Sequence, residues 1–102
     1  MANTFKNYTK ASIGTTGQSV YTVPSSTTSV MIGLNLSNTS ASQVTADVLL
    51  NGTYIVKNVP IPNGSSLDAL GGKIILETGD NVVVESDTAN SLDVILSVLE
   101  QT

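Results

Sequence analysis

The fold is decided by QVTADVLLNGTYIVKN, residues 43–58, in which two alternating segments meet at Asn51-Gly52. From Val44 to Leu50 an apolar residue stands at every second position. The second segment, which follows Asn51-Gly52, alternates less regularly. Successive side chains of a strand face opposite sides, so this pattern predicts a strand with one buried face. Asn-Gly favours a type I′ turn, because both residues tolerate a positive φ. The stretch therefore predicts a β-hairpin.

The rest of the chain repeats short alternating segments separated by turn residues. Gly, Pro, Asn, Asp and Ser gather at 14–17, 24–26, 60–66, 71–72, 78–80 and 87–90. About eight strands at a spacing of roughly 8–12 residues predict an all-β, antiparallel β-sandwich. A jelly roll is the preferred topology over an immunoglobulin-like one. Residues 13–102 are expected to form the sandwich domain, and residues 1–12, which alternate least, an N-terminal arm.

The strand phases predict which residues form the core. In residues 29–38, Val30, Ile32, Leu34 and Leu36 are expected to face inward, with Met31 on the opposite side. In the last strand, the inward positions are expected to be Leu92, Val94, Leu96 and Val98.

Composition limits the chemistry that the chain can perform. Its 102 residues carry a net charge of −4 and include no His, Cys or Arg. The commonest general base and the best nucleophile are therefore missing, as are the imidazole and thiolate ligands of zinc. We expect no enzymatic activity, no cofactor and no metal. The negative charge also argues against nucleic acid as a partner, because DNA binding needs Lys and Arg to displace counterions.

Membranes and export are not expected either. No segment approaches the roughly 18 apolar residues of a membrane helix, and residues 1–10 lack the apolar run of a signal peptide. The sequence predicts a protein that is made in the cytoplasm and has no membrane partner.

Three features resemble binding motifs but have simpler interpretations. Glu85 and Asp87 share one side of a strand and are possible calcium ligands, although a solvated acidic face is the preferred interpretation. Asp80, in Thr-Gly-Asp, is expected to hydrogen-bond to its own turn. A strand follows Gly71-Gly72, which favours a turn over a phosphate loop, since such a loop precedes a helix. The tyrosines Tyr8, Tyr21 and Tyr54 are expected in the core or at an interface, rather than in a base-stacking platform.

The last strand, SLDVILSVLE, is apolar on both faces. Ile95 and Leu99 point away from the predicted core, and other strands add Ile75, Val83, Met31 and Leu49 to this surplus. A sandwich buries only one face of each sheet, and a large apolar patch marks an interaction site.

Two covers for this surplus face are possible. The N-terminal arm could lay Phe5, Tyr8 and Ile13 over it, or a second copy of the chain could cover it. We expect a second copy. The residues predicted at this interface are Ile95, Leu99, Val83, Ile75, Phe5 and Tyr8.

Nearly the whole chain resembles a family of small virion structural proteins of tailed bacteriophages, including marine and cyanobacterial phages. The resemblance rests on MANTFKN (1–7), VYTVPSSTTSVMIGLNLSNTSAS (20–42), IVKNVPIPNGSS (55–66), GGKIILETGDNVVVESD (71–87) and SLDVILSVLE (91–100). It implies a non-enzymatic part of the virion, on the capsid surface as a decoration or cement protein, or at the neck or tail. It also implies a homo-oligomer, a trimer first of all, with other virion proteins as partners. The alternative is a carbohydrate- or calcium-binding module for host attachment that depends on Glu85 and Asp87.

Overall fold

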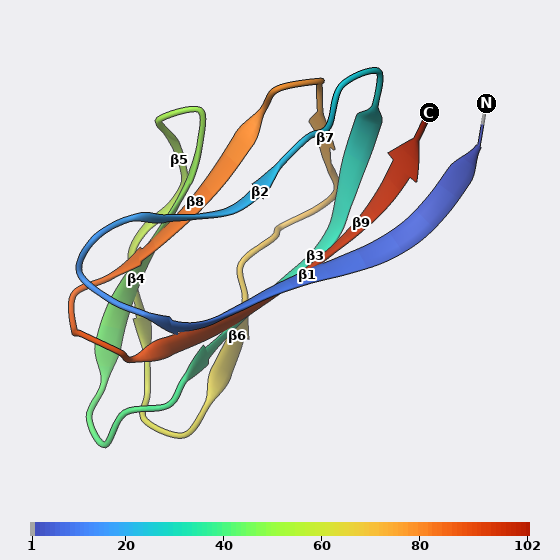
Figure 1. Ribbon diagram of the computed structural model, residues 1–102. Helices are drawn as coiled ribbons and strands as arrows, with labels where there is room; N and C mark the ends of the chain where they lie inside the picture. Colours follow the sequence, from blue (N-terminus) through green and yellow to red (C-terminus); the bar gives the residue numbers. More distant parts are fainter. Residues whose placement is uncertain (1) are drawn as a thin grey trace.

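The computed structural model describes residues 2–102, and their regular secondary structure consists entirely of β-strands. Two antiparallel sheets pack face to face, which confirms the predicted β-sandwich (Figure 1). The strands are β1 (Asn3–Ile13), β2 (Gln18–Thr22), β3 (Thr28–Asn38), β4 (Val44–Leu50), β5 (Thr53–Ile61), β6 (Ser66–Asp68), β7 (Ile74–Leu76), β8 (Asn81–Ser86) and β9 (Leu92–Gln101).

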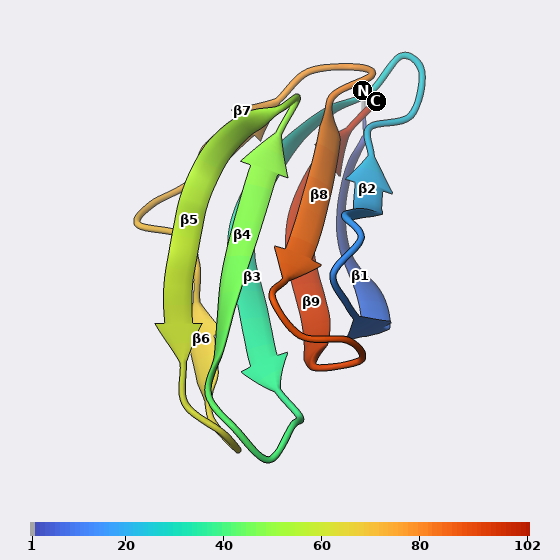
Figure 2. The ribbon, with the colours of Figure 1, turned by 90° about the vertical axis from the view of Figure 1, so that its left-hand side faces the viewer.

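The strand order is that of a jelly roll. One sheet, sheet A, has the order β1-β9-β3-β6, with β7 also paired to β3, and the other, sheet B, has the order β2-β8-β4-β5 (Figure 2). The first half of the chain pairs with the second half as β1–β9, β2–β8, β3–β6 and β7, and β4–β5. One long hairpin is thus wrapped into two sheets, as in jelly rolls. The predicted count of about eight differs from the nine observed because β6 and β7 are two short pieces against one strand.

The turn at the tip of this long hairpin has the predicted geometry. Asn51 has φ 51° and Gly52 has φ 79°, as a type I′ turn requires. In β4, Val44, Ala46 and Val48 are buried, so the predicted phase of this strand is confirmed.

The core lies between the two sheets and is aliphatic. All four inward positions predicted for β9 are 0–1% exposed, and they pack with Val82, Val84, Leu34 and Leu36 from neighbouring strands. Burial of one such side chain contributes about 1.5–3 kcal/mol. The core therefore accounts for every inward apolar residue of β9, and it leaves Ile95 and Leu99 outside.

The predicted phase of β3 is wrong in its first half. The register with β9 shifts between Met31 and Gly33, which indicates a β-bulge at Ile32. The extra residue turns Ile32 outward, where it is 42% exposed, and places Met31 in the core at 0% exposure. A bulge puts two residues opposite one, so it reverses the alternation along the strand. Met31 therefore does not belong to the apolar surplus.

The segment expected as an arm runs along the edge of sheet A. Residues 3–10 of β1 pair with β9 without a shift, and Ile13 at the end of β1 is fully buried. Ala2 and Thr102 exchange two backbone hydrogen bonds of 3.0–3.1 Å. The segment thus extends the sheet beside β9, and its residues do not lie over the outer face of β9.

Candidate self-association surface

A row of apolar side chains crosses four strands on the outer face of sheet A. Phe5 of β1 is paired with Leu99 of β9, which is paired with Val30 of β3, which is paired with Ile75 of β7. Phe5 is 75% exposed and Ile75 is 68% exposed, while the two between them are half-buried. We call these four residues the apolar row.

Two further apolar side chains lie next to the row on the same face. Ile32 reaches this face because of the bulge, and Ile95 lies further along β9 and is 47% exposed. Between Phe5 and Ile32 the surface is hollowed by about 280 Å³, and Lys6, Asn7, Ser97 and Val98 also line the hollow. The face is therefore apolar at its centre and contoured.

The remaining outward positions around the row are uncharged, and all of them except Gly33 are polar. They are Asn3, Asn7, Thr9, Ser97, Gln101, Thr28, Gly33 and Asn35. Charges occur at the rim of the face: Asp93 and Asp68 toward its far end, with Lys73 and Glu77 on either side of β7. An apolar centre without charges and a polar rim are typical of protein interfaces, because few charges must be desolvated.

The expectation that six residues form one surface requires correction. Phe5, Leu99, Ile75 and Ile95 share the outer face of sheet A, but Val83 and Tyr8 lie elsewhere.

Val83 belongs to the outer face of sheet B, where it is paired with Ser19 and with Leu49. Leu49 is in turn paired with Tyr54, which is 48% exposed. This second row contains three apolar residues, one fewer than the apolar row of sheet A, because its first position is Ser19. It also differs from the first in the charges beside it.

Beside that second row, charged side chains occupy the outer face of sheet B. Asp47 of β4 and Glu85 of β8 are direct cross-strand partners, and the Lys57 ammonium lies 5.1 Å from the centre of the Tyr54 ring. Two carboxylates directly opposite each other are unfavourable in a sheet. This face is thus a poorer candidate for contact between two copies of an acidic chain.

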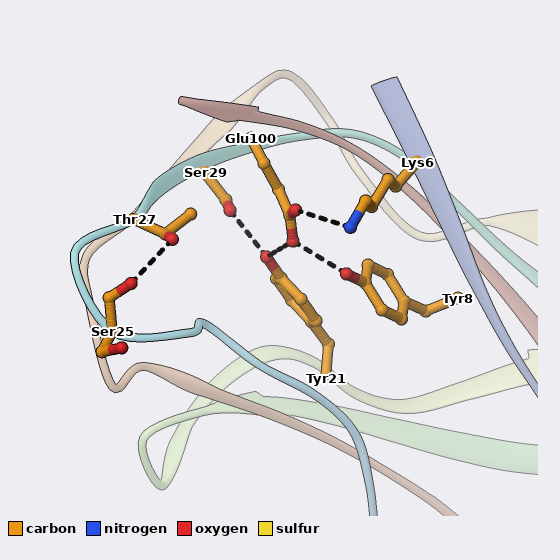
Figure 3. A network of polar contacts seen from close by, with 7 residues as sticks. All are labelled: Lys6, Tyr8, Tyr21, Ser25, Thr27, Ser29 and Glu100. Atoms are coloured by element: carbon orange, nitrogen blue, oxygen red, sulfur yellow. Dashed lines mark hydrogen bonds and ion pairs between the residues drawn. The ribbon is translucent and has the colours of Figure 1, made fainter. Parts of the chain in front are cut away.

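Tyr8 faces inward and belongs to a buried polar cluster (Figure 3). Its hydroxyl donates to Oε2 of Glu100 at 2.8 Å, and the hydroxyl of Tyr21 donates to the same oxygen at 2.6 Å. The two rings are 4.4 Å apart at their centroids. Lys6 Nζ lies 3.4 Å from Oε1 of Glu100, and Ser29 Oγ lies 2.7 Å from the Tyr21 hydroxyl. The cluster joins β1, β2, β3 and β9 at one end of the sandwich.

The cluster keeps its carboxylate ionised although it is only 5% exposed. The hydrogen bond from Tyr21 lowers the pKa of Glu100 more than burial raises it, and the bond from Tyr8 and the charge of Lys6 lower it further. Burial and the neighbouring carboxylate raise the pKa of both phenols. These donors make the burial of a charge tolerable. The arrangement therefore stabilises the sandwich and joins its edge strand to the core.

Glu100 is a structural residue that alternation alone does not reveal, although its position carries a signal. Position 100 continues the inward phase of Leu96 and Val98, so a carboxylate there needs buried donors. Tyr8 and Tyr21 are far from it in sequence, and only the sheet pairing brings them together.

Two acidic residues of the 77–87 segment accept hydrogen bonds from the backbone. Asp80 accepts from the backbone N–H of Glu77 at 2.9 Å and from Asn51 Nδ2 at 2.8 Å, as expected for a turn. Asp87 accepts from the backbone N–H of Thr45 at 3.1 Å. These bonds lower the pKa of both carboxyl groups. Within residues 2–102, no three Asp or Glu side chains form a group able to hold a metal ion.

Gly71-Gly72 lies in the exposed connection between β6 and β7, and the strand that follows confirms the turn. None of the elements between Ala2 and Thr102 is a helix of the length and apolarity that crossing a membrane requires.

Comparison with known proteins identifies a similar fold. No family model and no curated protein sequence matches the chain. A solved chain from Bacillus endospore appendages, described as a novel family of disulfide-linked pili, matches with a TM-score of 0.55 and 15% sequence identity. The match covers 99% of this chain and 87% of the pilus chain. At this identity the likeness concerns the fold alone.

Proposed function

We propose that this chain is a non-enzymatic structural subunit that associates with copies of itself through the outer face of sheet A. The observation that carries the proposal is the apolar row on a face whose central positions have no charge. Two copies with a net charge of −4 repel each other, so contact costs least where no carboxylate meets another. A partner of opposite charge would find no carboxylate to pair with at the centre of this face.

The setting that we propose is the virion of a tailed bacteriophage. The resemblance of residues 1–7, 20–42, 55–66, 71–87 and 91–100 to small virion proteins supports this setting. The protein would lie on the capsid surface as a decoration or cement protein, or at the neck or tail, beside other virion proteins. It would be made in the host cytoplasm, and a trimer is the assembly that the resemblance implies.

The similar pilus chain offers a contrast in how copies are joined. That chain belongs to disulfide-linked pili, whereas this chain has no cysteine. Copies of this chain therefore cannot be joined by disulfides, and we propose the apolar row as the main source of binding energy. Each buried apolar side chain of the row would contribute about 1.5–3 kcal/mol.

Quantitative mass spectrometry of purified virions tests the setting. We expect the chain in the particle, with a copy number that follows the icosahedral lattice for a decoration protein or the tail symmetry for a neck or tail part. Absence of the chain from purified particles would contradict the virion setting. Binding of calcium or host polysaccharide that is lost in Glu85→Gln would favour the host-attachment module instead.

A further inference from the structure

The hollow on the outer face of sheet A lies beside a pair of small residues, of which Ser97 lines it. Gly33 and Ser97 are cross-strand partners, and a Cβ added to Gly33 would meet only the Ser97 Cβ, at 3.8 Å. Phe5 and Ile32 stand on either side and form walls. The hollow therefore has two apolar walls, and Lys6, Asn7, Ser97 and Val98 complete its lining.

The hollow is large enough to receive an aromatic side chain. Its volume of about 280 Å³ lies at the lower limit of the roughly 300–1,000 Å³ of small-molecule sites. A ring needs less, since a cavity of about 150 Å³ holds benzene. Among residues 2–102 the most exposed large apolar side chain is that of Phe5, at 75%, and it lies on the same face directly beside the hollow.

We propose that a second copy docks on this face across a two-fold axis, so that Phe5 of each copy fills the hollow of the other. This inference rests on the proposed function and specifies its contact. A two-fold axis that lies in the plane of contact and passes between Phe5 and the hollow places each ring over the partner's hollow. An isologous interface requires such a self-complementary patch. The contact is therefore built from pairs of copies and differs from the three-fold contact that the resemblance implies.

Pairing of the two β1 edges is the competing mode of contact between copies. Lys6 and Lys10 lie on β1, so an antiparallel pair of β1 strands would concentrate four lysines along one seam. Charged residues, lysine above all, protect edge strands from such pairing. On the face, the Lys6 ammonium beside the hollow is already paired with Glu100 and the apolar row has no charge, so the face is the more favourable surface.

Two substitutions distinguish this contact from general stickiness of the face. Phe5→Ala removes the ring, and we expect the dissociation constant to rise about a hundredfold, roughly tenfold for each of the two symmetric contacts. Ser97→Leu fills the hollow while adding apolar surface to the face. Docking of the ring predicts weaker association for Ser97→Leu, whereas an unspecific apolar contact predicts stronger association. Tyr54→Ala, which removes an exposed ring from sheet B, is the matched control and should change nothing.

Mixing the two variants supplies the decisive measurement, by sedimentation velocity with circular dichroism to confirm folding. The Phe5→Ala chain keeps the Ile32 wall and the small Ser97 of its hollow, and the Ser97→Leu chain keeps its ring, so the mixture should form heterodimers more tightly than either variant forms homodimers. A mixture no tighter than either variant alone, a Ser97→Leu chain that associates more strongly, or a wild-type trimer would overturn the two-fold contact. In each of those cases a wild-type chain that associates leaves the proposed function standing. A wild-type chain that stays monomeric would overturn both.

Discussion

The outer faces of the two sheets differ in where their charges lie relative to their apolar residues. Each face has a cross-strand row, Phe5 to Ile75 on sheet A and Ser19 to Tyr54 on sheet B. On sheet B the row lies beside the opposed carboxylates of Asp47 and Glu85, whereas the charges of sheet A are confined to the rim. The comparison teaches that exposed apolar residues alone do not define an interaction surface. What surrounds them decides whether a second copy can approach.

The strongest test of this difference places the same charge on both faces. Leu99→Asp puts a carboxylate in the middle of the apolar row, and Leu49→Asp puts one at the matching half-buried position of sheet B. We expect Leu99→Asp to shift the assembly to monomer, with association weakened at least about a hundredfold, because a buried unpaired charge is costly. Leu49→Asp should associate as the wild type does. Sedimentation velocity measures the association of both variants. Equal losses of association in the two variants would show that the faces do not differ in this respect.

A change inside the sandwich separates stability from association. Tyr21→Phe removes the 2.6 Å hydrogen bond to the buried carboxylate of Glu100. We expect the free energy of unfolding to fall by about 1.5–3 kcal/mol, because bonds to buried charged groups are among the strong ones. The association constant of the folded chain should stay unchanged, since neither residue lies on the outer face. Urea unfolding and sedimentation measure the two quantities, and a parallel loss of both would show that the face depends on the cluster.

The pH dependence of unfolding provides a second way to separate stability from association. The pKa of Glu100 is lowered in the folded chain, chiefly by the Tyr21 hydrogen bond. A lowered folded pKa contributes stability above the unfolded value of about 4.5, and this contribution is lost as the pH falls through the folded pKa. We expect urea unfolding midpoints to decrease with acid in this window, with a flatter profile in Glu100→Gln. An unchanged slope in that variant would assign the acid sensitivity to other carboxyl groups.

The smallest expected effect concerns the charged face. Glu85→Thr removes the carboxylate opposite Asp47, while Asp47 keeps its 2.6 Å hydrogen bond from the Asn58 backbone N–H. We expect stabilisation by about 0.2–1 kcal/mol, because like charges directly opposite are destabilising. Thermal unfolding measures this difference at low salt. Raising the salt concentration should reduce the gain, and a gain that salt leaves untouched would have another cause.

Much of the fold could be predicted from the sequence because its strands are short and regularly punctuated. Asn51-Gly52 specified the central hairpin, and the alternation in β4, β8 and β9 specified their buried faces. The bulge at Ile32 could not be predicted, because the continuous apolar run Val30-Met31-Ile32 is compatible with a regular strand and with a strand that contains an extra residue. Residues 1–12 alternate least, and for that reason the sequence predicts an arm where the structure has the edge strand β1.

The candidate surface was partly predictable for the same reason. Phase alone placed Ile75, Ile95 and Leu99 outside the core, and the structure brings them to one face. Val83 has the same local pattern, but strand order assigns it to the other sheet, and phase carries no information on strand order. Tyr8 was misjudged because its partner Glu100 is 92 positions away.

Sedimentation equilibrium of the wild-type chain over micromolar concentrations tests most directly whether the outer face of sheet A joins copies of the chain. A contact through that face predicts a mass above the 10.5 kDa of one chain, a mass that rises with concentration and is maintained at high salt. A mass of 10.5 kDa at every concentration would contradict this role for the face.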